Sequence, residues 1–174
     1  MFIQKLYSLV STKLYWIILS IIGAAMLCVA LYYQHALGDE PCEVCIHIRI
    51  WVSAFTLLSI LMLILPSKKT ISIIGHLFNL VMVTGLLERC LYISRVEKGL
   101  VTDICSFYLN FPNWFALDKW FPAIFEVRNL CSFSPELILG ITMTDGLIVI
   151  ATVLTICSLA ALSLMLLYKP LKAS

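Results

Sequence analysis

Four long stretches of this sequence contain no charged residue, and they limit what the chain can fold into. They are residues 14–38, 50–67, 70–87 and 146–168, and none of them contains Asp, Glu, Lys or Arg. A helix of about 20 apolar residues crosses the roughly 30 Å hydrocarbon core of a bilayer. Hydrophobic residues make up 61% of the 174 residues, against about half in a soluble domain. The sequence therefore predicts a protein that spans the lipid bilayer.

The predicted fold is an all-α membrane protein, a single domain over residues 1–174 in which four transmembrane helices form an antiparallel bundle. The small residues Gly23 and Gly85 allow close helix contacts in lipid. We expect the spans at about 14–34, 44–65, 71–93 and 143–168, with outer loops at about 35–43 and 94–142.

The long loop contains a segment of mixed aromatic and charged character at residues 111–122. Trp and Phe beside Asp and Lys suit the boundary between water and lipid, so we expect a short interfacial helix here. A small apolar plug over the bundle is the alternative.

Lysine residues mark one side of the predicted bundle. All ten acidic residues fall in the two outer loops or at the span ends that face them. The positive-inside rule then places both termini in the cytoplasm and the cysteine pairs outside. These basic residues set topology, and nothing in the sequence indicates nucleic acid. We expect the first span to be retained, because no small-x-small cleavage site precedes its polar end. The lysines are Lys5, Lys13, Lys68, Lys69, Lys169 and Lys172.

Four of the seven cysteines are expected on the outer side of the membrane. Cys42 and Cys45 form a CxxC motif, while Cys105 and Cys131 lie in the long loop. Thiols in an oxidising compartment form disulfides, so two outward redox pairs are expected. The other three, which we expect to be packing residues, are Cys28, Cys90 and Cys157.

The CxxC motif stands beside a charged residue in an apolar span. Cys42, Cys45 and Arg49 have the spacing i, i+3 and i+7, which places them on one helix face. Both sulfurs then lie in the first turn, where the helix dipole lowers a thiol pKa. A cation inside a span is costly and is therefore a functional candidate, with snorkelling to the head groups as its alternative role.

These residues alone leave three kinds of function open. One is a membrane enzyme whose thiols cycle. A second is a non-catalytic scaffold with a static Cys105–Cys131 disulfide, which would stabilise the loop by roughly 3–4 kcal/mol. A third is a four-cysteine metal site, which the spacing favours less because the second pair is not a CxxC.

The sequence resembles the bacterial disulfide bond formation protein B (DsbB) family over nearly its whole length. The matching residues are Gln34-His35, Pro41-Cys42-x-x-Cys45-Ile46-x-x-Arg49, Cys105, Phe111-Pro112-x-Trp114, Leu117-Asp118-Lys119-Trp120-x-Pro122, Cys131, Leu139-Gly140 and Lys169-Pro170.

The resemblance implies a function in the bacterial inner membrane. A periplasmic, DsbA-like thioredoxin-fold protein would attack Cys105, and its partner thiol Cys131 would exchange with Cys42. Cys45 would face a membrane quinone, ubiquinone or menaquinone, with Arg49 and His35 as further cofactor-binding residues. An oxidase dedicated to one specialised DsbA-like partner is the nearest alternative. The chain departs from many relatives at Ile48, where a polar residue is usual, and at Glu43, whose charge opposes thiolate formation.

Overall fold

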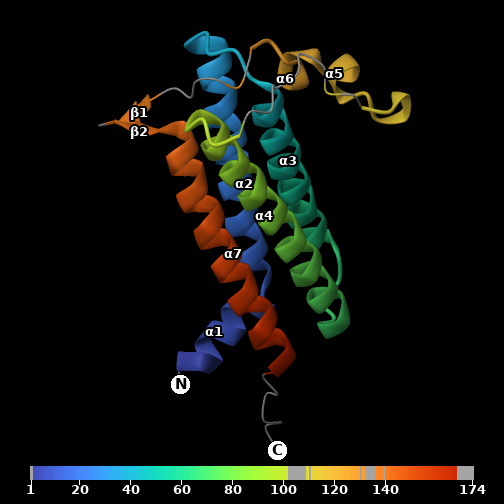
Figure 1. The fold of residues 1–174 in the computed structure, drawn as a ribbon. Helices are drawn as coiled ribbons and strands as arrows, with labels where there is room; N and C mark the ends of the chain where they lie inside the picture. Colours follow the sequence, from blue (N-terminus) through green and yellow to red (C-terminus); the bar gives the residue numbers. More distant parts are fainter. Residues whose placement is uncertain are drawn as a thin grey trace, which may run out of the picture.

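The computed structural model describes residues 2–101, 109, 111–129, 131, 136–138 and 140–167, and four long helices dominate it (Figure 1). Within these residues, all four helices are long and apolar enough to cross a membrane. The predicted all-α, four-span architecture is confirmed. The helices are α2 (Lys13–Ala36), α3 (Glu43–Ile64), α4 (Lys69–Glu97) and α7 (Met143–Leu167).

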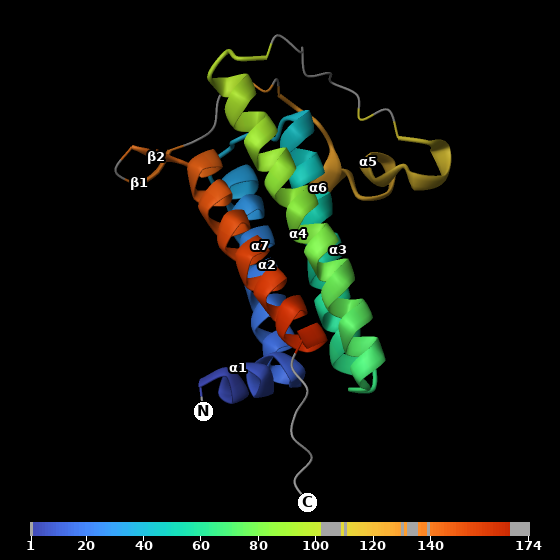
Figure 2. The same ribbon diagram turned by 60° about the horizontal axis from the view of Figure 1, so that its bottom comes forward.

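The long helices form one bundle, in which α3 packs on both α2 and α4, and α7 packs on α4 (Figures 1 and 2). Large apolar side chains such as Leu57 and Ile64 point outward and are 67% and 77% exposed. Polar side chains are buried inside, where Asn79 Nδ2 donates a 2.8 Å hydrogen bond to Ser158 Oγ between α4 and α7. Apolar side chains on the surface and hydrogen-bonded polar side chains in the interior suit a protein surrounded by lipid.

Small residues bring the helices together at two points. Gly85 of α4 faces the ring of Trp51, and Gly23 of α2 faces Thr56 and Phe55 of α3. A Cβ atom on Gly23 would overlap Thr56 Oγ1 and lie 3.1 Å from the Phe55 ring. The close contacts expected at both glycines are therefore present.

Replacing Gly23 with leucine should destabilise the protein, because the α2–α3 contact has no room for a side chain. Overpacking of this kind costs about 1–3 kcal/mol, so thermal unfolding in detergent should shift to a lower temperature. Ala24→Leu is the matched control, since Ala24 is exposed. Equal stability of the two variants would contradict the packing described here.

A short helix, α1 (Phe2–Ser11), precedes the first span and was not predicted. It packs on α2 and α7 at the end of the bundle away from the CxxC motif (Figure 2). Val10 is 6% exposed and packs in one apolar cluster with Ala161 and Met165. The segment therefore belongs to the folded bundle, whereas the sequence indicated only a basic flank.

The boundaries of α4 differ from the prediction at its outer end. The helix continues past the expected end at 93 to Glu97, and the chain turns at Gly99, whose φ is 66°. Charged residues such as Arg95 mark where a helix leaves lipid, but they do not stop it. A glycine with left-handed backbone angles ends the helix.

Three short helical turns replace the single interfacial helix expected at 111–122. They are η1 (Asn113–Phe115), α5 (Leu117–Trp120) and α6 (Pro122–Phe125). Pro122 starts a new turn because proline is favoured at a first helical position. The segment has two sides: Phe125 is buried against Ile46 of α3, while Trp114 is 76% exposed. It thus covers part of the bundle and also presents aromatic rings outward.

A small hairpin leads into α7. The strands β1 (Glu136–Ile138) and β2 (Ile141–Thr142) pair antiparallel, with Gly140 at φ 80° in the turn. Thr142 Oγ1 then accepts a 3.1 Å hydrogen bond from the backbone N–H of Asp145, and this contact caps the N-terminus of α7.

Candidate active site

The CxxC motif forms the first turn of α3. Cys42 has extended backbone angles (φ −85°, ψ 170°) and is the N-cap residue. Its Sγ accepts a 3.3 Å hydrogen bond from the backbone N–H of Cys45. Cys42 is 5% exposed and Cys45 is half-buried. Both thiols are free, so the structure holds this pair in its reduced form.

The pKa of Cys42 is raised well above its ordinary value. The hydrogen bond with the Cys45 side chain is the largest cause, and burial adds to it because a buried thiolate loses hydration. Backbone N–H groups of the helix start lower the pKa by less. The helix start lowers the pKa of Cys42 as expected, but the Cys45 hydrogen bond and burial outweigh it, so the net pKa is raised.

In the reduced protein, a small alkylating agent at neutral pH should modify Cys45 before Cys42. A raised pKa keeps Cys42 protonated, and one pKa unit changes the thiolate fraction about tenfold. We expect at least that difference in rate, measured by mass spectrometry of peptides after brief labelling. Protein unfolded in SDS should label both thiols at similar rates. Faster labelling of Cys42 in the folded protein would contradict the assignment.

Arg49 lies one turn further into α3 than Cys45 and is 6% exposed. It donates three hydrogen bonds to uncharged acceptors: Gln34 Oε1, the Ile124 carbonyl at 2.8 Å and the Ala30 carbonyl at 3.3 Å. No carboxylate forms an ion pair with it among the described residues. Since a guanidinium has five N–H donors, two remain without a partner in that part of the chain. Among the described residues, Arg49 is therefore a buried positive charge without a direct ion-pair partner.

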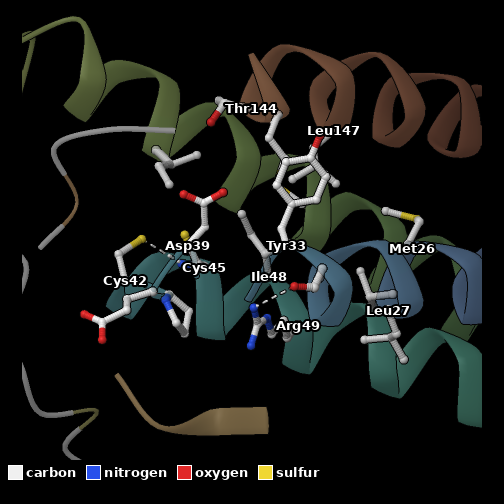
Figure 3. A pocket seen from close by; sticks show the side chains of 16 residues that line it. Met26, Leu27, Tyr33, Asp39, Cys42, Cys45, Ile48, Arg49, Thr144 and Leu147 are labelled. Carbon is white, nitrogen blue, oxygen red and sulfur yellow. Dashed lines mark hydrogen bonds between the residues drawn. The ribbon is translucent and has the colours of Figure 1, made fainter. Parts of the chain in front are cut away.

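Cys42, Cys45 and Arg49 line one open cavity of about 810 Å³ (Figure 3). Residues from α2 and α7 form its other walls, and most of these side chains are apolar. Thr144, which is 2% exposed, also lines it and donates a 2.9 Å hydrogen bond to Glu97 of α4. The remaining walls include Met26, Leu27, Tyr33, Asp39, Val52 and Leu147.

The segment that carries Cys131 is fastened to the start of α3. The backbone N–H groups of Arg128 and Asn129 both donate to the Pro41 carbonyl, at 3.0 and 3.2 Å, and Asn129 pairs with Cys42 as a β-bridge. Cys131 is 7% exposed and belongs to the same apolar cluster as Cys42. It is disulfide-bonded. Cys105, its expected partner, lies outside the described residues.

His35 does not line the cavity. Its side chain is exposed, and its Nε2 lies 3.2 Å from the Ala123 carbonyl. The neighbouring Gln34 is 7% exposed and contacts Arg49 instead. No role for Gln34 in the site is predicted from the sequence. A polar amide at the end of an uncharged span was the available signal.

The other cysteines occupy two environments. Cys90 is fully buried in the cluster that contains Cys42 and Cys131, as expected of a packing residue. Cys28 and Cys157 are exposed on the outer surface of the bundle, so the packing role expected for them is wrong. Within the described part of the chain, no group of three or more His, Cys, Asp or Glu side chains is arranged to hold a metal ion.

Membrane-spanning helices, a reduced CxxC pair and a buried arginine on one cavity define a multi-pass membrane protein with a thiol redox site. The family model for Disulfide bond formation protein DsbB matches residues 12–161, and the chain belongs to this family. In its general role it is therefore a disulfide-generating membrane oxidoreductase.

Individual relatives agree with the family model. Disulfide bond formation protein B of Shewanella amazonensis is 28% identical over 158 residues, which cover 90% of this chain and 94% of the relative. Disulfide bond formation protein B 2 of Pseudomonas aeruginosa is 30% identical over 133 residues, 75% of this chain and 79% of the relative. The protein B of Pasteurella multocida is 29% identical over 142 residues, 81% and 80% of the two chains.

Proposed function

We propose that this chain reoxidises a DsbA-type thioredoxin-fold protein of the periplasm and passes the electrons to a membrane quinone, ubiquinone or menaquinone. The observation that carries the proposal is the shared cavity, which brings the Cys45 side chain and the Arg49 guanidinium to one space between α2, α3 and α7. Residues near one end of these helices line the cavity, and in the proposed reaction a soluble thiol protein and a lipid-soluble oxidant both act at this end.

The lining of the cavity fits a quinone. Mostly apolar walls with a few polar groups are typical of small-molecule sites, and this cavity has such a lining. Met26, Leu27 and Val52 offer apolar contact to a ring, while Arg49 offers N–H donors to a carbonyl oxygen. When bound, a quinone supplies the capacity to accept two electrons and two protons.

The thiols supply the other half of the reaction in two exchanges. A thiolate of the soluble partner attacks the Cys105–Cys131 disulfide, and the second partner thiolate releases it, so the partner gains a disulfide and this pair gains two electrons. Cys131 then attacks the Cys42–Cys45 disulfide, and Cys105 completes the exchange. The electrons end on Cys42 and Cys45 as a dithiol.

Arg49 stabilises negative charge in the cavity. A fixed cation in a site of low polarity favours both a Cys45 thiolate and a developing oxyanion, without reorganisation during the reaction. Gln34 and the Ile124 carbonyl orient the guanidinium through hydrogen bonds and leave its charge intact. Gln34 is therefore a positioning residue.

The charge distribution supports the proposed orientation. Lys13, Lys68 and Lys69 lie at the starts of α2 and α4, at the end of the bundle opposite the cysteines. The positive-inside rule assigns that end to the cytoplasm. The cysteine pairs then face the periplasm of a bacterial inner membrane, where disulfides persist.

An oxidase dedicated to one specialised partner has one observation in its favour. Asp39 and Glu40 line the mouth of the cavity, and Glu43 follows Cys42 directly. Their charge suits a partner whose redox site has a basic surface.

The test is turnover of a soluble quinone analogue by the purified protein in detergent with a reduced DsbA-type protein. Loss of quinone absorbance should match the partner disulfide formed, one for one. Protein that has been reduced and fully alkylated beforehand is the control and should give none. If oxidised, quinone-supplied protein accepts no electrons from any DsbA-type protein, the proposal is wrong.

A further inference from the structure

Helix α1 runs out sideways from the end of the bundle away from the CxxC motif, in both views of the fold (Figures 1 and 2). Its last residues pack on the bundle, where Val10 is 6% exposed. Ile3, near its other end, is 57% exposed. The described part of the chain therefore covers only part of this helix.

The exposed Ile3 lies on the same face of α1 as the buried Val10. Ile3, Leu6 and Val10 have the spacing i, i+3 and i+7, which forms one stripe along a helix. Val10 faces the membrane-spanning helices, since it shares an apolar cluster with Ala161 and Met165 of α7. Ile3 continues that stripe beyond the edge of the bundle, so it points toward the lipid layer that the bundle crosses.

The opposite face of α1 is polar. Gln4, Lys5 and Ser8 are spaced to share that face, and all three residues are exposed. An apolar stripe on one side and a polar or charged face on the other is typical of helices that lie along a membrane surface. The two faces of α1 therefore match the two sides of such a surface.

The connection between α1 and α2 fixes the direction of α1. Thr12, the single residue between the two helices, has extended backbone angles (φ −94°, ψ 162°). Its backbone N–H and its hydroxyl both donate to the Leu9 carbonyl, at 3.3 and 2.8 Å. Ser11 Oγ donates to the Ser8 carbonyl at 3.1 Å. These bonds satisfy carbonyls in the last turn of α1, so the turn has a defined geometry.

The lipid-facing surface of the bundle begins directly after this turn. The first turns of α2 present the exposed side chains of Leu14, Ile17 and Ile18. Lipid surrounds a membrane-spanning helix at such positions. Since only Thr12 separates the two helices, the apolar stripe of α1 starts where this lipid-facing surface starts.

We propose that α1 lies in the head-group region of the bilayer, with Ile3 and Leu6 against the acyl chains and Lys5 facing water. Lipid is the occupant because the stripe is continuous with a surface that already faces lipid. Residues 1–38 contain no Asp or Glu, so the charge of Lys5 is free to attract the phosphates of head groups. The helix thereby anchors this end of the bundle at the membrane surface. The proposal rests on the membrane-spanning fold and not on the redox function.

The test places a photoreactive residue in α1 of the whole protein, in bilayer nanodiscs of phosphatidylethanolamine and phosphatidylglycerol. p-Benzoylphenylalanine, which inserts into nearby C–H bonds on irradiation, replaces Ile3 or Ser8 in separate variants. Mass spectrometry should detect at least about fivefold more lipid adduct at position 3, because the apolar face of an interfacial helix lies about 5–10 Å deep in the lipid boundary. Leu57, exposed on the membrane-spanning surface, is the positive control.

The alternatives give different products. A covalent dimer at position 3 would identify a second copy of this chain as the occupant. No adduct at position 3, with normal adduct at position 57, would place the stripe in water. Equal lipid adduct at positions 3 and 8 would show that α1 has no preferred face. Each of these three results overturns the proposal.

A milder change keeps the proposal testable if a photoreactive variant does not fold. Trypsin cleaves after Lys5 only when α1 opens locally. Ile3→Ser should therefore speed this cleavage in nanodiscs about fivefold, the effect expected of the apolar surface that it removes from lipid. Gln4→Ser is the matched control, which removes no apolar side chain and should change the rate less than about twofold. An unchanged rate in Ile3→Ser would overturn the proposal.

Discussion

Turnover with the soluble partner and quinone should fall at least about a thousandfold when Cys45 is replaced with serine, because removing a reacting nucleophile is among the largest single losses in catalysis. A hydroxyl cannot form the disulfide that Cys42 needs as its partner. Cys45 also lines the cavity beside Arg49, and the other thiol of the described chain that lines it, Cys42, is the partner in the same disulfide.

The same variant should accumulate an intermediate. Without Cys45, the Cys42 thiolate attacks the Cys105–Cys131 disulfide, joins one sulfur of that pair and frees the other. Cys45 is not there to draw Cys42 back into the first pair, so non-reducing peptide mapping should detect a fraction of Cys42 linked to the second pair. Cys28→Ser is the matched control, since Cys28 is exposed on the outer surface of α2, away from the cavity, and should leave turnover unchanged. Substantial activity in Cys45→Ser would contradict the thiol order proposed here.

Replacing Arg49 with methionine should lower the maximal rate of quinone reduction by about 100-fold or more, as removal of one fixed charge-stabilising donor does elsewhere. Methionine keeps the apolar stem but removes the charge and all three hydrogen bonds to Gln34, Ala30 and Ile124. Lysine should restore only part of the rate, because one ammonium cannot satisfy acceptors on two sides.

The control for Arg49→Met is Arg89→Met. Arg89 is an arginine near the same end of the bundle, but its side chain is 39% exposed and pairs with Glu88 at 2.9 Å. Its removal should have little effect on rate, since surface ion pairs contribute little. Thermal unfolding of both variants separates loss of catalysis from loss of fold. A normal rate in folded Arg49→Met would exclude the electrostatic role of this residue.

Local spacing was enough to predict the centre of the candidate site. Cys42, Cys45 and Arg49 lie within two helical turns, so their common face follows from the 3.6-residue period alone. The partners of Arg49 are different, since they lie 15, 19 and 75 residues away in the sequence. Such contacts depend on how α2 is rotated and where α6 lies, and neither follows from periodicity.

His35 and Gln34 show that helix periodicity does not predict which of two adjacent residues faces a neighbouring helix. Adjacent residues on a helix point about 100° apart, so only one of them can face α3. Both residues are polar, and His35 was predicted as the site residue because a histidine side chain can carry a proton. The structure turns Gln34 toward Arg49 and leaves His35 exposed.

The four spans were predictable because each is an unbroken apolar run of membrane length. Helix α1 was not predictable in this way, because its 10 residues are divided between an apolar face and a polar face. A search for long apolar segments therefore does not detect it. The turns at 113–125 escaped for another reason: aromatic composition indicates an interface but does not say where prolines divide a helix.

The Pro41 carbonyl, which accepts hydrogen bonds from Arg128 and Asn129, has a kinetic consequence. This carbonyl fixes Asn129 beside Pro41, the residue directly before Cys42. Cys131 follows Asn129 by only two residues. A sulfur on so short a tether meets its target at a high effective molarity, so exchange between the two pairs should be independent of how much protein is in the membrane. The encounters with the soluble partner and with the quinone, in contrast, would respond to concentration.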